Sequence, residues 1–492
     1  MTLLDSLELT VARVHQAYEE GSLTAESLTR SYLERITAYD QAGPAINSVI
    51  LVNPRALEEA RELDRRYREE GKFTGPLHGI PVLLKDNVNT KDMATTAGSK
   101  SLEGFVPDQD AFITKKLRAA GAFIIAKTNL HEFAIWGETI SSILGQTKNP
   151  YDLTRTPGGS SGGTGAAVAA NFGIIGIGTD TINSIRSPAS ACSLAGIRPT
   201  VGLVSRAGVV PYSMTQDTAG PICRTVEDCV RTLEAIAGYD PQDDETAWSA
   251  GRIPASYMAS LKEEGLQGKR IGILESFFGK EEINEPVNRI MKEALDRFKE
   301  GGAVLVSITD EIDSDDMIKN VSVHLDDFKT DVDTYLESLG PKAPVHSVEE
   351  ILASGKYHPG IEDNLKIALG LSQGTPSYNE KRMRQLLMRT RIMKIMADHD
   401  LDALVYPHQQ QLVCKIGEGQ KQRNGVLCSA TGFPSIAVPA GFAPDENAPL
   451  GVPVGLEIIG RPFSEPALIE IAYAFEQKTK VRQAPLSTPA LQ

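Results

Sequence analysis

Apolar residues recur along the chain in two patterns, and these two patterns alternate. Spacings of three and four residues predict amphipathic helices, whereas short uninterrupted apolar runs predict buried strands. In the N-terminal half, helices are expected at 7–38, 56–70 and 112–120, and the first of them is split at Gly21-Ser22, with Thr24 as an N-cap. One strand is expected to end at Lys85, and two more are expected at 122–126 and 173–178. Strands that alternate with helices indicate an α/β fold with a mixed central β-sheet covered by helices on both faces.

The character of the sequence changes after residue 241. An acidic, turn-rich run at 239–245 marks a boundary, and 309–376 is the least regular part of the chain. Further strands are expected at 269–274, 303–308, 401–406 and 454–459, and helices at 284–299, 379–398 and 466–479. We therefore expect one α/β core in two parts, 1–241 and 398–492, with an inserted, mainly helical lobe at 242–397 that selects substrate.

Composition narrows the function without defining it. The 492 residues are 41% hydrophobic and carry a net charge of -14, which argues against a nucleic-acid partner. The start lacks a signal-type segment, and the longest apolar run, 166–178, is too short and glycine-rich to span a bilayer. Five cysteines without a C-x-x-C pair are typical of reduced thiols. These features favour a cytoplasmic protein without a membrane partner.

Candidate chemistry begins with two serines in glycine-rich or turn-like surroundings. Ser160 lies in Pro-Gly-Gly-Ser-Ser-Gly-Gly (157–163), and Ser184 lies in Gly-Thr-Asp-Thr-Ile-Asn-Ser-Ile-Arg (178–186). Serine is a poor nucleophile unless a nearby base removes its proton. Residues 158–162 fit G-x-S-x-G, the nucleophile elbow of α/β-hydrolases, with His408 as a candidate base. However, a loop precedes Ser160 where the elbow needs a strand, and His408 has no obvious companion acid.

Lys85 is the other candidate base. A lysine at the end of a buried strand loses solvation, which disfavours its charged form and lowers its pKa. To act as a free base near neutrality its pKa must fall by about three units, which requires roughly 4 kcal/mol from its surroundings. The alternative is a lysine whose ammonium reaches solvent from the strand end.

Three ordered motifs favour the lysine. Gly-Ile-Pro-Val-Leu-Leu-Lys-Asp (79–86), Gly-Gly-Ser-Ser-Gly-Gly (158–163) and Gly-Thr-Asp-Thr-x-x-Ser-Ile-Arg-x-Pro (178–188) together closely resemble the amidase signature family. The segments 121–133, 217–221 and 432–439 are similar to the family as well, and the resemblance extends from about residue 23 to 481. It implies a hydrolase of amide bonds with a Ser-Ser-Lys triad: Ser184 as nucleophile, Ser160 as a bridging serine after a cis peptide bond, and Lys85 as base. The implied chemistry requires no cofactor and no metal.

The resemblance also implies an oxyanion hole made by backbone N–H groups. The positions that match are Thr181, Ile182, Asn183 and Ser184. The common family pattern has two glycines where this chain has Ile182 and Asn183. Glycine is needed where φ is positive, and a β-branched residue adopts positive φ poorly. Either position 182 has an ordinary negative φ or the hole is reshaped; Ile182 would then narrow the acyl pocket.

Three neighbours are expected to support the site. Asp180 and Arg186 flank the nucleophile loop and are expected to fix it through an ion pair, because buried charges are usually paired. Ser161 is expected to be a hydrogen-bonding companion of Ser160 at the start of a helix.

Three functions remain open at this level. The first is a stand-alone amidase that acts on a small-molecule amide, as a monomer or a homodimer. The second is the amidase (glutaminase) subunit of a glutamyl- or aspartyl-tRNA amidotransferase, whose Lys-Arg-Arg-Ile pattern is not reproduced at 378–384. The third is a scaffold that lost catalysis through the change at 182–183. Retention of Lys85, Ser160 and Ser184 together favours an active enzyme, and the missing pattern favours the stand-alone form.

Overall fold

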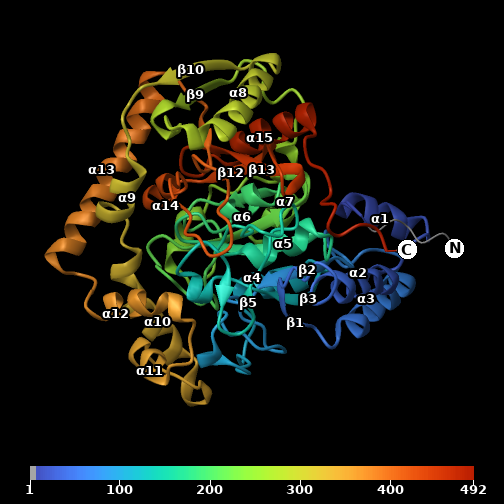
Figure 1. The fold of residues 1–492 in the computed structure, drawn as a ribbon. Helices are drawn as coiled ribbons and strands as arrows, with labels where there is room; N and C mark the ends of the chain where they lie inside the picture. Colours follow the sequence, from blue (N-terminus) through green and yellow to red (C-terminus); the bar gives the residue numbers. More distant parts are fainter. Residues whose placement is uncertain (1–6, 492) are drawn as a thin grey trace.

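The computed structural model describes residues 7–491, which form one 11-stranded sheet and a separate two-stranded sheet (Figure 1). The order in the large sheet is β1-β3-β2-β6-β8-β7-β12-β13-β11-β9-β10. Its strands are β1 (Val49–Val52), β2 (Pro81–Lys85), β3 (Phe123–Thr128), β6 (Ile175–Asp180), β7 (Ala195–Arg198), β8 (Thr218–Cys223), β9 (Arg270–Leu274), β10 (Val304–Ile308), β11 (Ala403–Pro407), β12 (Ser435–Asp445) and β13 (Ala448–Ile459); β4 (Ile140–Ser141) and β5 (Gly145–Gln146) make the small sheet.

Parallel and antiparallel pairs coexist in the large sheet, as the sequence predicted. Strand β2 runs parallel to both β3 and β6, whereas β6 pairs with β8 and β12 with β13 in antiparallel fashion. Every residue of β2, β3 and β6 is buried, which explains why these strands read as continuous apolar runs without alternation.

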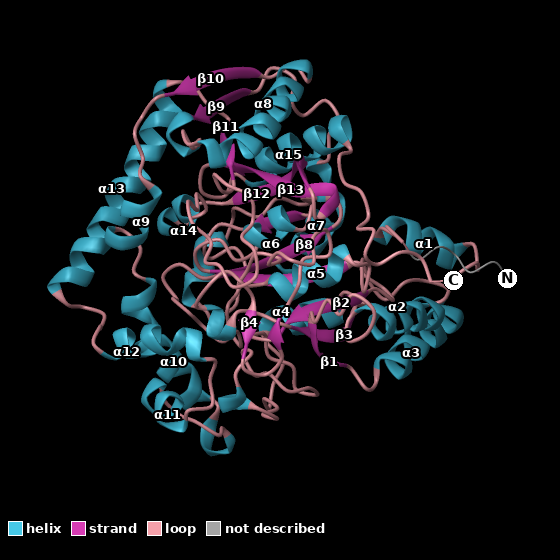
Figure 2. Ribbon diagram, viewed as in Figure 1, coloured by secondary structure: helices cyan, strands magenta, loops and turns pink. Residues whose placement is uncertain are grey.

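Helices flank the sheet, so the expected α/β class is confirmed (Figure 2). Helices α5 and α6 contact each other and the central strands, while α4, α7, α15 and α8 contact one another in succession. Their bounds are α1 (Val11–Glu19), α2 (Ala25–Tyr39), α3 (Ala56–Glu70), α4 (Phe112–Ala119), α5 (Gly162–Ala169), α6 (Arg186–Ala191), α7 (Val226–Ile236), α8 (Glu285–Glu300), α14 (Val426–Thr431) and α15 (Glu465–Thr479). The predicted split of the first helical segment is present, and Thr24 caps α2 in a capping box with Ser27.

The inserted segment contains the expected two strands and the helix between them, and its least regular part, 309–376, forms further helices. Residues 242–397 contribute β9, α8 and β10, and these two strands join the edge of the large sheet beside β11. The helical part follows them along one side of the molecule (Figures 1 and 2): α9 (Ser314–Asn320), α10 (His324–Ser338), α11 (Val348–Ser354), α12 (Glu362–Leu369) and α13 (Pro376–Asp398). We place the lobe at these helices, and its role in substrate selection stays a proposal.

The two ends of the described chain lie close together on the opposite side (Figure 1), where Arg482 Nε pairs with Glu8 Oε2 at 2.8 Å. The buried Arg35 of α2 donates to the carbonyl oxygens of Thr488 and Pro489, both at 2.8 Å. All five cysteines are buried free thiols. None of the described helices is long and apolar enough to cross a bilayer.

Candidate active site

The carboxyl ends of β2 and β6 bring the candidate base to the serine segments. These strands are parallel neighbours with Leu84 opposite Ile177, so Lys85 ends one strand beside the last residues of the other. Lys85 is fully buried. Its Nζ lies 2.8 Å from Ser160 Oγ and 2.8 Å from Thr179 Oγ1. The predicted approach of positions 85 and 160 is therefore present, and the lysine does not extend to solvent.

Burial sets the protonation of this lysine. It lowers the Lys85 pKa from 10.5 to about 7, although the carboxylates of Asp180 and Asp217 partly oppose the fall. A neutral amine has one lone pair, which can accept the Ser160 proton while an N–H donates to Thr179. The site therefore contains a base that is substantially unprotonated near neutral pH.

A second buried lysine shows the contrast. Lys127 Nζ lies 3.1 Å from Asp86 Oδ1 and also donates to Thr95 Oγ1 at 2.9 Å. Burial lowers its pKa too, but the Asp86 carboxylate acts in the opposite direction. Lys127 is thus held as an ion pair, while no carboxylate contacts Lys85 in the described part of the chain.

The Ser160 loop is fixed by its backbone. The Gly159–Ser160 peptide bond is cis, as the resemblance implied. The Ser160 carbonyl accepts from His131 N at 3.0 Å, and the neighbouring Ser161 N donates to the Ser184 carbonyl at 3.3 Å, which joins the two serine segments. Ser161 Oγ donates to Thr179 O at 3.1 Å, and Ser161 directly precedes α5. Between residues 7 and 491 no hydrogen bond links the Ser160 and Ser184 hydroxyls.

The nucleophile segment presents unused amides. The N–H groups of Ile182, Asn183 and Ser184 donate to no acceptor among the described residues. Neither Ile182 nor Asn183 has a positive φ, so the first of the two expected alternatives for position 182 holds. The Ile182 side chain is partly buried against an apolar cluster that includes Val426 and Leu427 of α14.

Buried charges hold this segment in place. Arg186 contacts Asp180 (Nη2–Oδ1, 3.0 Å), and Arg198 contacts the same carboxylate (Nη1–Oδ1, 2.7 Å). Asp180 also accepts from Ile185 N at 3.0 Å, and Arg186 donates to Ile182 O at 2.7 Å. Burial alone would raise the Asp180 pKa, but the two guanidinium groups hold it well below its usual range. The expected pairing of Asp180 with Arg186 is present.

Several partners were not found from the sequence. Thr179 Oγ1 accepts hydrogen bonds from Lys85 Nζ at 2.8 Å and from Asn87 Nδ2 at 3.0 Å. Glu457 Oε1 accepts a hydrogen bond from Arg186 Nη1, and Glu457 Oε2 lies 2.8 Å from His408 Nδ1. His408 is thus committed to Glu457 and hydrogen-bonds to neither candidate serine, which removes the support for an α/β-hydrolase elbow. Of these partners, only Thr179 lies inside one of the three sequence motifs, and this position was the one sequence signal that could have pointed to it.

Comparison with known proteins defines the class to which this fold belongs. The Amidase family model matches residues 27–469, so the chain is an amide-hydrolysing enzyme and a member of that family. Among solved structures it is similar to the native peptide amidase of Stenotrophomonas maltophilia, with 38% identity and a TM-score of 0.89 over 97% of this chain and 98% of that one.

Two curated relatives of similar identity carry different functional names. A protein of Arabidopsis thaliana named "Probable amidase" is 36% identical over 97% of this chain and 91% of its own length. A glutamyl-tRNA(Gln) amidotransferase subunit of a Synechococcus strain is 34% identical over 98% of this chain and 94% of its own length. The solved structure of the subunit with the same name from Thermotoga maritima has 28% identity and a TM-score of 0.76 over 98% of both chains.

Proposed function

We propose that this amidase cleaves a carboxylic amide to a carboxylate and ammonia or an amine through an acyl-enzyme on Ser184. The observation that carries the proposal is the buried contact of Lys85 Nζ with Ser160 Oγ at 2.8 Å, combined with a Lys85 pKa of about 7. A lysine that is partly neutral at the working pH can accept a proton that a charged lysine cannot.

In the proposed first half-reaction a proton moves along the relay, the bond between Ser184 Oγ and the carbonyl carbon forms, and the C–N bond breaks. Ser160 takes the Ser184 proton and passes its own to Lys85 Nζ, while Ser184 Oγ attacks the amide carbonyl. The negative oxygen of the tetrahedral intermediate meets the free amides of Ile182, Asn183 and Ser184. The relay then returns the proton to the leaving nitrogen, which is too basic to depart as an anion, and the C–N bond breaks.

Water completes the cycle by the same route. It replaces the departed amine, gives a proton to the relay and attacks the ester carbon of the acyl-enzyme. The C–O bond to Ser184 breaks, and the relay returns its proton to Ser184 Oγ as the carboxylic acid leaves and gives its own proton to solvent. Thr179 holds the Lys85 amine in place throughout, since it accepts from both Lys85 and Asn87.

A glutaminase subunit of a tRNA-dependent amidotransferase is the second candidate, because a curated relative with an amidotransferase name is 34% identical over nearly the whole chain. The structural comparison favours the stand-alone amidase: the TM-score is 0.89 with a peptide amidase and 0.76 with the amidotransferase subunit. The two functions differ in whether the purified chain alone releases ammonia from amides other than glutamine.

The test uses the purified chain, a panel of simple amides and peptide amides, and a fluorophosphonate probe followed by peptide mapping. We expect turnover without a partner and labelling at Ser184. Ser184→Ala should abolish both, Lys85→Ala should nearly abolish turnover, and Ser160→Ala should leave a trace. Ser338→Ala, on the exposed surface of α10, is the matched control and should behave as the unaltered protein. Full activity of Ser184→Ala would refute the assignment, and activity on glutamine alone would favour the amidotransferase.

A further inference from the structure

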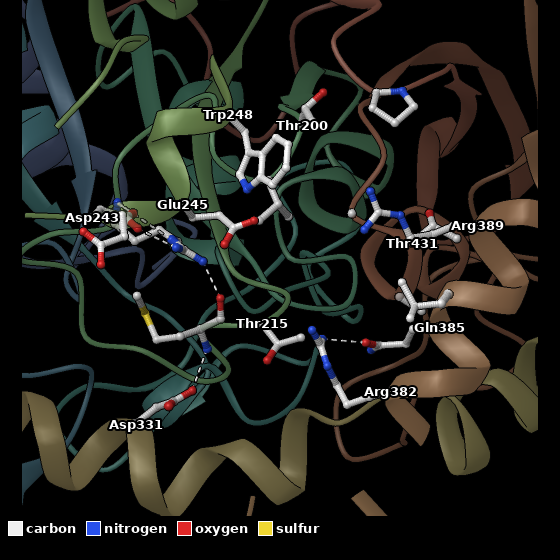
Figure 3. Close-up of a pocket in the computed structure, with 18 of the residues that line it drawn as sticks. Thr200, Thr215, Asp243, Glu245, Trp248, Asp331, Arg382, Gln385, Arg389 and Thr431 are labelled. Carbon is white, nitrogen blue, oxygen red and sulfur yellow. Dashed lines mark hydrogen bonds and ion pairs between the residues drawn. The ribbon is translucent and has the colours of Figure 1, made fainter. Parts of the chain in front are cut away.

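A cavity of about 1010 Å³ lies between the helical lobe and the core, and neither Lys85, Ser160 nor Ser184 lines it. Its walls come from the two-turn 3-10 helix η3 (Asp244–Ser249), the turn at Met214–Thr215, residues 378–389 of α13, and the segments 430–432 and 462–463. In Figure 3, Asp243, Glu245 and Asp331 lie on one side of the space, while Arg382 and Arg389 lie on the other.

The cationic wall is not neutralised by the protein. Arg382 and Arg389 are seven residues apart on α13 and therefore project from the same face of the helix. Arg382 Nη1 donates to the amide oxygen of Gln385 at 2.8 Å, and Arg389 has no hydrogen-bond or ion-pair partner among the described residues. Two positive charges at this wall thus lack a carboxylate.

The anionic wall is divided between used and unused carboxylates. Asp243 pairs with Arg206 (Oδ1–Nη2, 2.6 Å), and Asp331 accepts from Met214 N at 2.6 Å. The carboxylates of Asp244 and Glu245 accept no hydrogen bond within the described chain. Free charges of both signs therefore line the cavity without pairing across it, and Arg252, which also has no carboxylate partner within 7–491, lies against Trp248.

An aromatic surface completes the cavity. Trp248 of η3 is 61% exposed, which is unusual for so large an apolar side chain. The guanidinium of Arg252 lies 5.9 Å from the centre of the Trp248 ring and 4.6 Å from that of Phe463. Figure 3 shows the Trp248 ring between Glu245 and Arg389, where an apolar group could cover it.

We propose that this cavity binds a short peptide with free ends: a carboxylate held by Arg382 and Arg389, an ammonium held by Asp244 and Glu245, and an apolar side chain against Trp248. Guanidinium groups bind carboxylates through paired charge-assisted hydrogen bonds, which suits the α13 wall. A simple anion satisfies only that wall and meets the acidic wall unfavourably. A ligand with both charges satisfies both walls, and this requirement selects a zwitterion.

The cavity is connected to the nucleophile segment by hydrogen bonds. Gln385 accepts a hydrogen bond from Arg382, and its Nε2 donates to Gln216 Oε1 at 3.1 Å. Gln216 Nε2 donates in turn to Thr181 O at 3.2 Å, next to the free amides. A carboxylate that draws Arg382 away from Gln385 alters this chain, so the bound peptide changes the turnover of amides at the Ser184 site. The binding itself does not depend on the proposed mechanism.

Calorimetric titration of glycyl-phenylalanine into the Ser184→Ala protein tests the binding without turnover. The matched probes are N-acetyl-glycyl-phenylalanine, which lacks the ammonium, and glycyl-phenylalaninamide, which lacks the carboxylate. We expect the dipeptide to bind and each blocked form to bind at least about tenfold more weakly, because each loses a charge-assisted contact. No binding of the dipeptide overturns the proposal; equal binding of the N-acetyl form does so as well, because it shows a simple anion site.

Variants in the otherwise unaltered protein locate the site. Arg389→Gln and Glu245→Gln should each weaken dipeptide binding about tenfold or more while the KM for a simple amide stays the same. Arg384→Gln is the control, since Arg384 is on the same helix but pairs with Glu380 at 2.7 Å and does not line the cavity. Unchanged dipeptide binding in Arg389→Gln, or equal weakening in Arg384→Gln, overturns the proposal even if the triad assignment holds.

Discussion

Replacing Lys85 by methionine should abolish activity and yet stabilise the protein at neutral pH. Burial lowers the Lys85 pKa from 10.5 to about 7, and such a fall corresponds to about 5 kcal/mol of unfavourable free energy in the folded state. Methionine fills a similar volume and does not incur this cost. The substitution also removes the hydrogen bonds of Lys85 Nζ to the Ser160 and Thr179 hydroxyls, which destabilises the folded protein by about 1–3 kcal/mol. The expected net gain is about 2–4 kcal/mol at pH 7.

The sign of the pH dependence gives a sharper test than the size of the gain. Between pH 7 and 10.5 the unfolded chain holds a proton on Lys85 that the folded chain has released, so the stability of the unaltered protein rises with pH in this range. The Lys85→Met variant has no amine at this position, so this contribution to the pH dependence of stability is absent from it. Its advantage should therefore be full at and below pH 7 and shrink by about 1.4 kcal/mol for each pH unit above it.

Urea unfolding followed by circular dichroism at several pH values, with both proteins measured side by side, gives this difference. The matched control is Lys127→Met, because Lys127 is equally buried but paired with Asp86 at 3.1 Å. Removal of one partner of a buried ion pair costs about 3–5 kcal/mol, so this variant should be destabilised. If Lys85→Met loses as much stability as Lys127→Met, or if its advantage does not change between pH 7 and 9, the reasoning about Lys85 is refuted.

The remaining predictions concern rates and the buried charges. The kcat/KM of the unaltered enzyme should rise through an apparent pKa of about 7 as Lys85 loses its proton, and a flat profile from pH 6 to 9 would contradict a lysine base. Thr179→Val removes the acceptor of both Lys85 and Asn87 and should lower kcat about tenfold or more with little change in KM, as initial rates would show. Asp180→Asn leaves Arg186 and Arg198 without that carboxylate and should lower the free energy of unfolding by about 3–5 kcal/mol. If thermal unfolding gives a free energy within about 1 kcal/mol of that of the unaltered protein, this prediction is wrong.

The sequence predicted the parts of the site that depend on local pattern. The apolar run before Lys85 indicated a buried strand, and the structure has every residue of Pro81–Lys85 buried. The partners that are distant in the sequence could not be found in this way. Glu457 meets Arg186 across 271 positions, and nothing in a β13 strand segment indicates which buried carboxylate faces which guanidinium. Likewise β9 and β10 were expected as strands, but their place at the edge of the central sheet follows from pairing with β11, which no single segment encodes.

The departure at positions 182 and 183 is best understood from the contacts around it. A loop that depended on glycine for positive φ would not tolerate isoleucine, but position 182 does not adopt positive φ here. Contacts from outside fix the segment instead: Arg186 binds the Ile182 carbonyl at 2.7 Å, and Asp180 binds the Ile185 amide at 3.0 Å. The Ile182 side chain adds an apolar contact with the cluster to which Val426 and Leu427 of α14 belong. Because these contacts use the Ile182 carbonyl, the Ile185 amide and side chains, the amides from 182 to 184 stay free, and the change from glycine does not remove the N–H donors of the proposed oxyanion hole.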